Sequence, residues 1–428
     1  MRLAVTVAFL FFSTLLTAQT LVWEKVESRN PVAVFRPEAF TIALSGSIYV
    51  TGQYDNGDSF FVQVNGMTKY ADTTLPGIDA CMFLFKFNAD GKFIKRQFIR
   101  GLSSEYKKLT PDDFKRGNLM LPDVASGNSI IATTDNKLLT TGFASGYRKK
   151  NYETDRTQGV FTAMLDTNLL VYWDKMYPYY FNSSPQKVLE TTDGQFVILA
   201  YGHLGPRIMK ISAKGDLITD TLLQDLPTPE DYDFDDTSRQ THLKGEATSF
   251  VATPTGYIFS GTAKKKSWNY NRMQAILIET DKNFKSLKKS AYTLFREKYS
   301  QYDFLGGYLA VNKSVIALTG IAQIGYPPGF TAFIDRKTFD TLGVVHFESN
   351  VFNYPGIVQT GAGKYAVAVR DHHKDAIQVH FIENYKIKKT ITLNKYPIME
   401  YVDMQVHGNH LYILGEANKG VYMAKVKF

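Results

Sequence analysis

The chain has 428 residues, of which 44% are hydrophobic and 14% aromatic, a content that permits a large buried core. Its 49 Lys and Arg against 41 Asp and Glu give a net charge of +8. No recognised nucleic-acid-binding motif accompanies this mild basicity, which argues against a nucleic-acid partner. The single cysteine, Cys81, excludes an internal disulfide, and its place in the apolar stretch ACMFLFKF predicts a buried, inert thiol.

Residues 1–19 have the layout of a secretory signal peptide. Arg2 precedes an apolar run over residues 3–16, and small or polar residues follow at 17–19. The run is shorter than the ~20 residues needed to span a bilayer, and no later segment is long and apolar enough, so no transmembrane segment is expected. We expect cleavage near Ala18 or Gln19 and export of residues 20–428 as one domain to the periplasm, the outer-membrane surface or the medium.

The mature chain begins with a predicted strand, LVWEKV, over residues 21–26. It matches VYWDKM at residues 171–176, with a tryptophan and a lysine at the same positions. The later chain predicts a repeat of four strands, in which residues 171–176 are the fourth strand of the second unit. Residues 21–26 are therefore expected to be a fourth strand as well.

Seven later stretches share one pattern: a tight turn of Gly, Asn, Asp, Ser or Pro, followed by a strand rich in Val, Ile, Leu and Tyr that often ends on Gly. This pattern is typical of a β-hairpin, and its recurrence indicates a repeat protein. The stretches are ALSGSIYVTGQY (43–54), TTDNKLLTTGFA (133–144), TTDGQFVILAYG (191–202), ATPTGYIFSGTA (252–263), AVNKSVIALTGIA (310–322), QTGAGKYAVAVRD (359–371) and QVHGNHLYILGEA (405–417).

A second pair of strands follows each hairpin, as in MFLFKFNADGKFIK and RIMKISAKGDLIT, except that the seventh copy ends after its third strand, GVYMAKVKF. Four antiparallel strands per unit are typical of propeller blades. The predicted fold is an all-β, seven-bladed β-propeller of four-stranded antiparallel blades. The N-terminal strand 21–26 is expected to complete the last blade and close the ring, which leaves no open edge between the first and last blades.

The stretch VYWDKMYPYYFNSSPQKVLETTDGQFVILAYG, followed by RIMKISAKGDLI, resembles the bacterial secreted β-propeller repeat. In that repeat a Trp-x-Lys strand leads into a Thr-x-Asp-Gly turn, an apolar strand and a Lys-containing strand with an Asp-Gly turn. The resemblance covers nearly all of the mature chain but is sharp only in the second and third blades, and Tyr177-Pro178 replaces a glycine-rich blade junction. It implies an exported or cell-envelope propeller and transfers no catalytic motif.

The connections fall into two classes of length. Turns between the first and second strands of a blade, and between the third and fourth, are short throughout. In an antiparallel blade the remaining connections emerge together on the opposite face. Because functional residues concentrate on loops held by a rigid scaffold, we place the binding site on that face. Its expected loops are residues 53–77, 101–124, 144–158, 224–245, 263–272 and 370–375.

Two of these loops combine aromatic and cationic residues: Tyr147, Arg148 and Lys149 in one, Trp268 and Tyr270 in the other. Aromatic rings offer flat apolar contact to sugars or protein side chains, while Lys and Arg attract carboxylate, sulfate or phosphate groups. The pairing predicts contact with a protein partner or an acidic glycan. Exposed solubilising loops with a few packed aromatics are the alternative.

No linear catalytic motif is present: neither a Gly-x-Ser-x-Gly elbow, a His-Glu-x-x-His helix, a phosphate-binding glycine loop nor an Asp-box repeat. No residue is therefore assigned a catalytic role. Propeller hydrolases and lyases assemble their acids and bases from separate blades, however, so this absence discriminates poorly. The further ligand-contact candidates in loops of the same face are His203, Arg207, Tyr326, His372 and His373.

The acidic stretch EDYDFDD places Asp231, Asp233 and Asp235 at alternate positions, as calcium loops do. Asp236 stands where an EF-hand needs Gly, and His242 stands where it needs Glu, so an EF-hand is excluded. A solvated acidic loop is the simpler interpretation, with a looser calcium site as the alternative. No metal or cofactor is expected.

Two functions remain open from the sequence. The first is a non-enzymatic exported binding or assembly propeller that holds an envelope protein or a glycan on its long-loop face. The second is a propeller carbohydrate-active enzyme, a lyase or hydrolase of an acidic polysaccharide. A cluster of perturbed carboxyl groups, or of His, Tyr and Arg, at the mouth of the central channel would favour the enzyme, whereas a broad aromatic patch would favour binding.

Overall fold

The computed structural model describes residues 19–27, 33–56, 60–64, 67–71, 80–99, 124–150, 153–179, 184–202, 205–222, 232–233, 246–265, 273–292, 303–323, 328–350, 355–371, 373–417 and 420–428. All of the elements found there are β-strands. Within these residues no helix is long and apolar enough to cross a membrane. The predicted signal peptide lies outside them, apart from Gln19.

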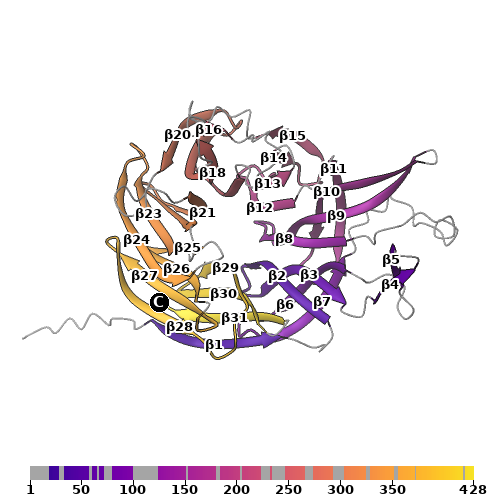
Figure 1. The fold of residues 1–428 in the computed structure, drawn as a ribbon, viewed down its shortest axis with the longest axis horizontal. Helices are drawn as coiled ribbons and strands as arrows, with labels where there is room; N and C mark the ends of the chain where they lie inside the picture. Colours follow the sequence, from indigo (N-terminus) through magenta and orange to yellow (C-terminus); the bar gives the residue numbers. More distant parts are fainter. Residues whose placement is uncertain are drawn as a thin grey trace, which may run out of the picture.

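Seven antiparallel sheets stand around a common axis, each with the four strands of a blade, which confirms the predicted propeller (Figure 1). The sheet of blade 4 carries a fifth strand, β16 (Tyr232–Asp233). Blade 1 comprises β2 (Ala33–Ile42), β3 (Ile48–Asn56), β6 (Ala80–Phe87) and β7 (Phe93–Ile99); blade 2, β8 (Val124–Ala132), β9 (Leu138–Lys150), β10 (Glu153–Leu165) and β11 (Val171–Tyr179); blade 3, β12 (Ser184–Glu190), β13 (Phe196–Gly202), β14 (Gly205–Ile211) and β15 (Leu217–Leu222). Blade 4 comprises β17 (Glu246–Ala252), β18 (Gly256–Lys265), β19 (Met273–Asp281) and β20 (Ser286–Tyr292); blade 5, β21 (Asp303–Val311), β22 (Val315–Gln323), β23 (Pro328–Asp335) and β24 (Thr341–Asn350); blade 6, β25 (Gly356–Gly361), β26 (Lys364–Asp371), β27 (Ala376–Glu383) and β28 (Lys386–Leu393).

Blade 7 joins the two ends of the described chain. It combines β29 (Glu400–His407), β30 (His410–Ala417) and β31 (Gly420–Lys427) with the N-terminal strand β1 (Thr20–Glu27). β1 runs antiparallel to β31, from Thr20 opposite Lys427 to Glu27 opposite Val421, and the two lie side by side in Figure 1. Across this pair the Tyr422 hydroxyl donates a hydrogen bond of 2.7 Å to Glu24. The predicted ring closure is confirmed, with the strand one residue longer at each end.

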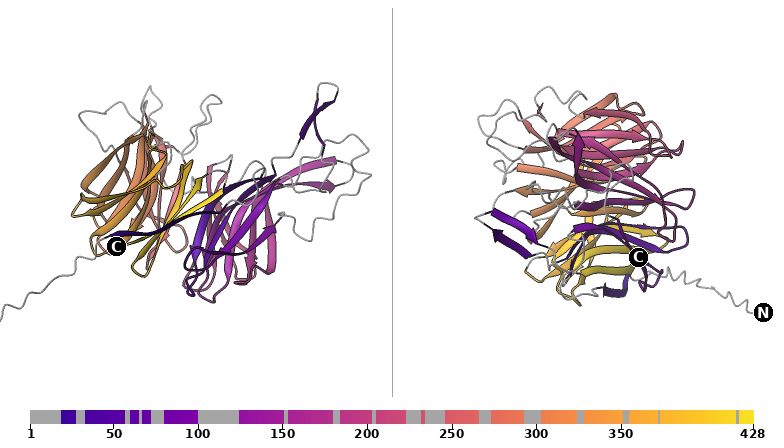
Figure 2. Two further views of the ribbon diagram at one scale, coloured as in Figure 1. Left: turned by 90° about the horizontal axis from the view of Figure 1, so that it is seen from below. Right: turned by 90° about the vertical axis from the view of Figure 1, so that its right-hand side faces the viewer.

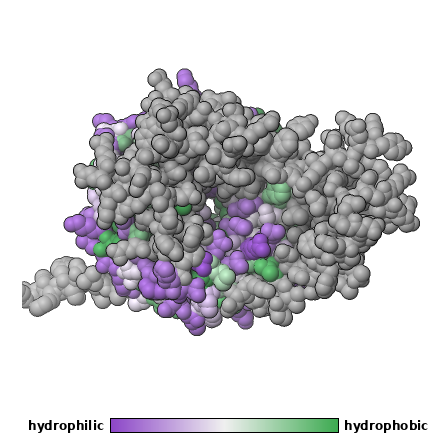
Figure 3. Space-filling model, viewed as in Figure 1, coloured by the Kyte–Doolittle hydropathy of each residue, from purple (hydrophilic) through white to green (hydrophobic). Residues whose placement is uncertain are grey.

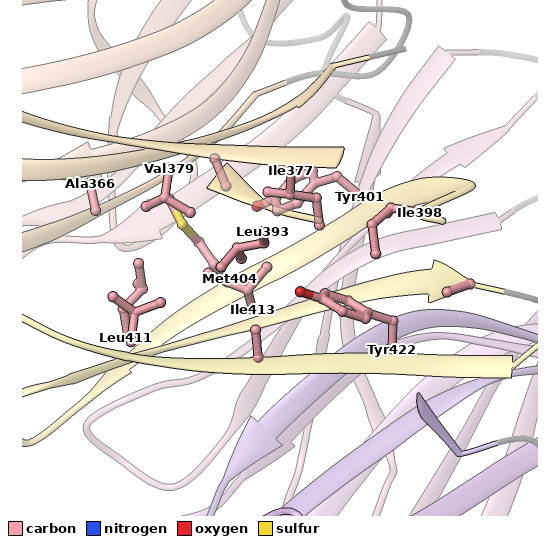
Figure 4. Close-up of a cluster of buried hydrophobic side chains, with 14 of the residues drawn as sticks. Ala366, Ile377, Val379, Leu393, Ile398, Tyr401, Met404, Leu411, Ile413 and Tyr422 are labelled. Carbon is pink, nitrogen blue, oxygen red and sulfur yellow. The ribbon is translucent and has the colours of Figure 1, made fainter. Parts of the chain in front are cut away.

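The core consists of the apolar layers between neighbouring blades. Figure 4 shows one such layer, in which Ile377 and Val379 of blade 6 face Met404 and Ile413 of blade 7. Strand residues alternate between the two faces of a sheet, and because each blade is covered on both faces, both sets of side chains are buried. Cys81, in β6, is 1% exposed, which confirms the predicted buried thiol.

A side-chain latch links blade 2 to blade 3. The ring of Trp173 on β11 lies over Gly215 in the turn between β14 and β15, where a Cβ atom would lie 2.8 Å from the ring. Lys175 forms a 2.7 Å ion pair with Asp216 in the same turn, and the Tyr177 hydroxyl donates to the Gly215 carbonyl at 2.6 Å. Gly215 has a φ of +79°, so both the turn and the ring contact require glycine.

The same latch joins blade 7 to blade 1. Trp23 on β1 lies over Gly91 in the turn between β6 and β7, with 2.7 Å from the ring to a Cβ placed there. The Lys25 amine donates to the carbonyl oxygen of Asp90. The sequence match between 21–26 and 171–176 therefore has a structural basis, because each tryptophan and lysine fastens an outer strand to the glycine turn of the next blade.

The two faces of the ring differ as expected. On one face, which we call the short-turn face, short turns join the first strand of a blade to the second and the third strand to the fourth. In one of these turns the backbone N–H of Thr191 donates a 2.8 Å hydrogen bond to the carbonyl oxygen of Gln195. The remaining connections lie on the opposite, long-loop face. Two predicted loops there are partly strands: 53–77 contains the hairpin of β4 (Phe60–Val64) and β5 (Met67–Ala71), and 144–158 is mostly β9 and β10. Figure 2 shows both hairpins projecting from the ring.

Candidate functional site

The predicted aromatic and cationic residues divide between strand and undescribed loop. Tyr147, Arg148 and Lys149 lie on β9, opposite Arg156, Asp155 and Thr154 of β10. The prediction of a loop at these positions was wrong, because the strand pairing of blade 2 continues well beyond the ring. Candidates outside the described residues are Trp268, Tyr270, His203, Tyr326 and His372.

Arg207 and His373 are described. Arg207, near the long-loop end of β14, forms a bidentate ion pair with Asp220 of the neighbouring strand β15. His373 is exposed, and its backbone N–H donates to the Asp371 carboxylate at 3.1 Å. Because they lie in blades 3 and 6, the structure does not bring these two residues together.

The acidic stretch contributes one short strand. β16 (Tyr232–Asp233) pairs with the end of β18, where Asp233 lies opposite Lys264. Asp231 and Asp235 fall outside the described residues, so the calcium alternative stays a prediction. Among the described residues, no three His, Cys, Asp or Glu side chains are grouped so that they could hold a metal ion.

A repeated bulge shapes the innermost strand of most blades. Register shifts interrupt the pairing of the first and second strands at the same level in β2, β8, β12, β17, β21 and β29. These strands, with β25, enclose the central channel, which is visible as a hollow at the ring centre in Figure 3. In β2 the bulge leaves Glu38 exposed between the buried residues Pro37 and Ala39, so its carboxyl group reaches the mouth of the channel.

Five charged residues meet at this mouth on the long-loop side, and we call them the rim cluster. Glu400 at the start of β29 lies directly opposite Glu416 near the end of β30. Arg36 and Glu38 come from β2 of blade 1, and Arg370 comes from the end of β26 in blade 6. The cluster therefore joins the two blades that flank blade 7 to blade 7 itself.

Electrostatics couples the members of the rim cluster. Removal from bulk water raises the pKa of Glu38 to about 7, and the charges of Glu400 and Glu416 act in the same direction, while Arg36 opposes them. Glu38 remains exposed to the water of the mouth, which screens these effects and makes 7 an upper limit. Burial also raises the pKa of Glu416, with Glu400 adding to the increase.

Arg370 brings positive charge to the same cluster. Burial lowers its pKa, and the negative charges of Asp375, Glu400 and Glu416 counteract that effect. Its guanidinium lies 3.8 Å from Asp375, but the buried Nε has no hydrogen-bond acceptor among the described residues. The mouth therefore presents carboxyl groups that accept or donate hydrogen bonds and arginines that attract anions.

Sequence reasoning missed the rim cluster because its members are strand residues and not loop residues. Functional residues were expected on the long loops, whereas Glu38 lies within β2 and Glu416 within the apolar strand β30. The available signal was the charge itself: FRPE and LGEA place charged residues in strands that are otherwise buried. Only the bulge and the ring closure bring them to one place.

Comparison with known proteins identifies no family. No protein-family model matches the chain, and no curated protein matches it. Solved structures with a similar fold include a protein of unknown function from Dyadobacter fermentans (11% identity, 96% of this chain and 99% of that chain, TM-score 0.49). Others are the periplasmic gluconolactonase of Pseudomonas aeruginosa (11%, 84% and 85%, 0.46) and Drosophila plexin A in complex with semaphorin 1b (9%, 96% and 87%, 0.48). At these values the likeness carries no argument about function.

Proposed function

We propose that the protein is an exported, non-enzymatic binding propeller that holds an envelope protein or a glycan on its long-loop face. The signal-peptide layout of residues 1–19 supports export to the periplasm, the outer-membrane surface or the medium. The resemblance of the Trp-x-Lys and Thr-x-Asp-Gly motifs to the bacterial secreted propeller repeat supports the same assignment.

The rim cluster is the observation that carries this proposal. Glu400 and Glu416 are like charges directly opposite each other on neighbouring strands, an arrangement that destabilises a sheet. Glu38 adds a third carboxyl group. Its removal from bulk water and the charges of Glu400 and Glu416 all oppose its ionisation. A ligand that donates hydrogen bonds to these carboxylates and offers an anion to Arg36 or Arg370 would offset that repulsion, as glycan hydroxyls or protein side chains do.

Affinity capture from the protein's own envelope extract tests the binding function. The bait is the tagged mature chain, compared with a rim variant (Glu400→Gln with Glu416→Gln) and a loop variant in which Tyr147, Arg148, Trp268 and Tyr270 become Ala. Lys214→Ala, in a turn of the short-turn face, is the matched control. A stoichiometric partner lost by the rim or loop variant and kept by the control supports the proposal.

Polysaccharides are tested on an immobilised panel with the same four proteins. Failure of the wild type to retain any protein or glycan in both formats would reject the binding function. Equal retention by wild type, rim variant and loop variant would place the contact elsewhere on the ring.

A carbohydrate-active enzyme is the second candidate, and the pKa of Glu38 favours it. A carboxyl group whose pKa is raised towards neutral pH, beside further carboxyl groups, has the properties of a general acid with a neighbouring base. Such an enzyme would cleave acidic polysaccharides, with Glu38 protonating the leaving oxygen. We would measure new reducing ends and unsaturated products from uronic acid polymers. Glu38→Gln should abolish the release while leaving folding intact, and the absence of products with the wild type rejects this candidate.

A further inference from the structure

One level of the central channel carries two opposite charges that do not touch. The residues that follow the bulge of the inner strand are Ala39 in blade 1, Ser129 in blade 2, Lys187 in blade 3, Ser249 in blade 4, Leu309 in blade 5 and Asp403 in blade 7. Because these strands occupy equivalent places in the ring, the six residues stand at the same depth. Blades 3 and 7 are separated by two blades on one side and three on the other, so Lys187 and Asp403 lie on opposing parts of the wall.

Among the described residues, the amine of Lys187 has one hydrogen-bond partner. Its amine lies 3.3 Å from the hydroxyl oxygen of Ser249, which is itself fully buried. Within the part of the chain that the structure describes, no carboxylate lies within 4.0 Å of this amine. An ammonium group has three N–H donors, so Ser249 fixes the position of the side chain and leaves donors directed to other acceptors.

An ammonium group without an adjacent anion is costly inside a protein. Burial lowers the pKa of Lys187, and Asp403 is the charged group that acts against this decrease. The other residues that follow the bulge are uncharged: Ala39, Ser129, Ser249 and Leu309. Lys187 is half-buried on the inner strand of blade 3. A bound anion would stabilise the ammonium form.

Asp403 supplies the complementary chemistry. Its carboxylate accepts a 2.8 Å hydrogen bond from the backbone N–H of Met404 and further hydrogen bonds from the Gln405 side chain and the backbone N–H of Phe40. Burial raises its pKa to about 6. At neutral pH it is an acceptor for hydroxyl donors, and its charge repels ligands that carry a second negative group.

We propose that Lys187 binds the carboxylate of a small hydroxy acid of the uronic acid type inside the central channel, while Asp403 accepts hydrogen bonds from its hydroxyl groups. A neutral sugar lacks the anion for Lys187, and a polyanion is repelled by Asp403. Both residues follow the bulge of their strands, so the site begins one residue deeper in the ring than Glu38 of the rim cluster.

Calorimetry on the mature chain tests the site with three probes: D-glucuronate, D-glucose and citrate. The variants are Lys187→Met and Asp403→Asn, and Lys214→Met in an exposed turn of the same blade is the control. We expect glucuronate alone to bind. Lys187→Met should weaken that binding about tenfold or more, the range expected for a hydrogen bond to a charged group, and Lys214→Met should leave it unchanged.

Proton uptake gives a second readout on the unsubstituted chain. A bound anion favours the ammonium form of Lys187. When the pH is above the pKa of Lys187 in the unliganded protein, glucuronate binding should therefore take up protons, and the affinity for glucuronate should fall as the pH rises. Two buffers of different ionisation enthalpy measure this uptake. Three results would overturn the proposal. They are the absence of glucuronate binding by the wild type, glucuronate binding that Lys187→Met leaves intact, and glucuronate binding without proton uptake at any pH. Equal binding of citrate and glucuronate would contradict the part of the proposal in which Asp403 excludes polyanions.

Discussion

Glycines in the second strand of each blade show how single residues set the geometry of the channel. The residue opposite the inner-strand bulge is Gly in five blades, as with Gly52 and Gly142, and Ala in blade 3. A Cβ atom on Gly142 would lie 1.7 Å from the backbone oxygen of Ser126, and one on Gly52 would lie 2.0 Å from that of Arg36. The bulge that exposes Glu38 at the mouth thus depends on a missing side chain one strand away.

Replacing Gly142 by Ala should destabilise the protein by about 3 kcal/mol, because the inner strand of blade 2 must move to accept the methyl group. Gly361 is the matched control: a Cβ there has only ordinary contacts at 3.8 Å or more. Gly361→Ala should change stability by no more than about 0.5 kcal/mol. Urea denaturation of both variants gives the comparison, and equal effects of the two substitutions would contradict the close approach.

His380 gives a pH dependence of stability. It is 6% exposed, stacks on Phe347 at 5.0 Å between ring centroids, and shares a 2.9 Å hydrogen bond with Thr390. Burial lowers its pKa from 6.5 to about 4. Between these values the unfolded chain binds a proton that the folded chain does not, so stability falls as the pH drops from 6.5 towards 4.

Over that range the loss due to His380 should approach about 3 kcal/mol. The measurement is the free energy of unfolding of wild type and His380→Phe at several pH values between 7 and 4. The wild type should lose more stability than the variant on acidification, and parallel curves would contradict the assignment.

At the scale of elements, the tryptophan latches hold an outer strand to the next blade. Those of Trp23 and Trp173 are alike in contact, but they differ in topology. β11 is joined by a short turn to the rest of blade 2, whereas β1 enters blade 7 from the other end of the described chain and covers the edge of β31. A latch failure at Trp23 therefore opens the ring and exposes a strand edge.

Trp23→Ala and Trp173→Ala should each cost about 2–3 kcal/mol, below the value for a fully buried tryptophan because both rings are half-buried. Hydrogen exchange should separate them. In Trp23→Ala, the backbone amides of β1 and β31 should exchange faster than in the wild type, while in Trp173→Ala they should keep their protection. Unchanged protection of β1 in Trp23→Ala would show that strand pairing alone closes the ring.

At the scale of the whole molecule, the fold was predictable because the repeat is local. Each blade encodes its own turns and alternating strands, and the Trp-x-Lys match identified β1 as the missing strand of blade 7. The rim cluster was not predictable, because Glu38, Arg370 and Glu416 are far apart in sequence and come together only through closure of the ring. The long β9–β10 hairpin was missed for a related reason, since its polar residues conceal strand pairing that a loop prediction does not expect.

Carboxyl footprinting of the protein with and without its captured partner tests the central claim most directly, namely that the long-loop face holds the ligand. A carbodiimide label modifies exposed carboxylates, and mass spectrometry reads each site. We predict that the partner lowers labelling of Glu38 and Glu400 at the channel mouth and leaves Asp193 and Asp216 of the short-turn face unchanged. Protection of Asp193 and Asp216 with full labelling of Glu38 and Glu400 would contradict the account.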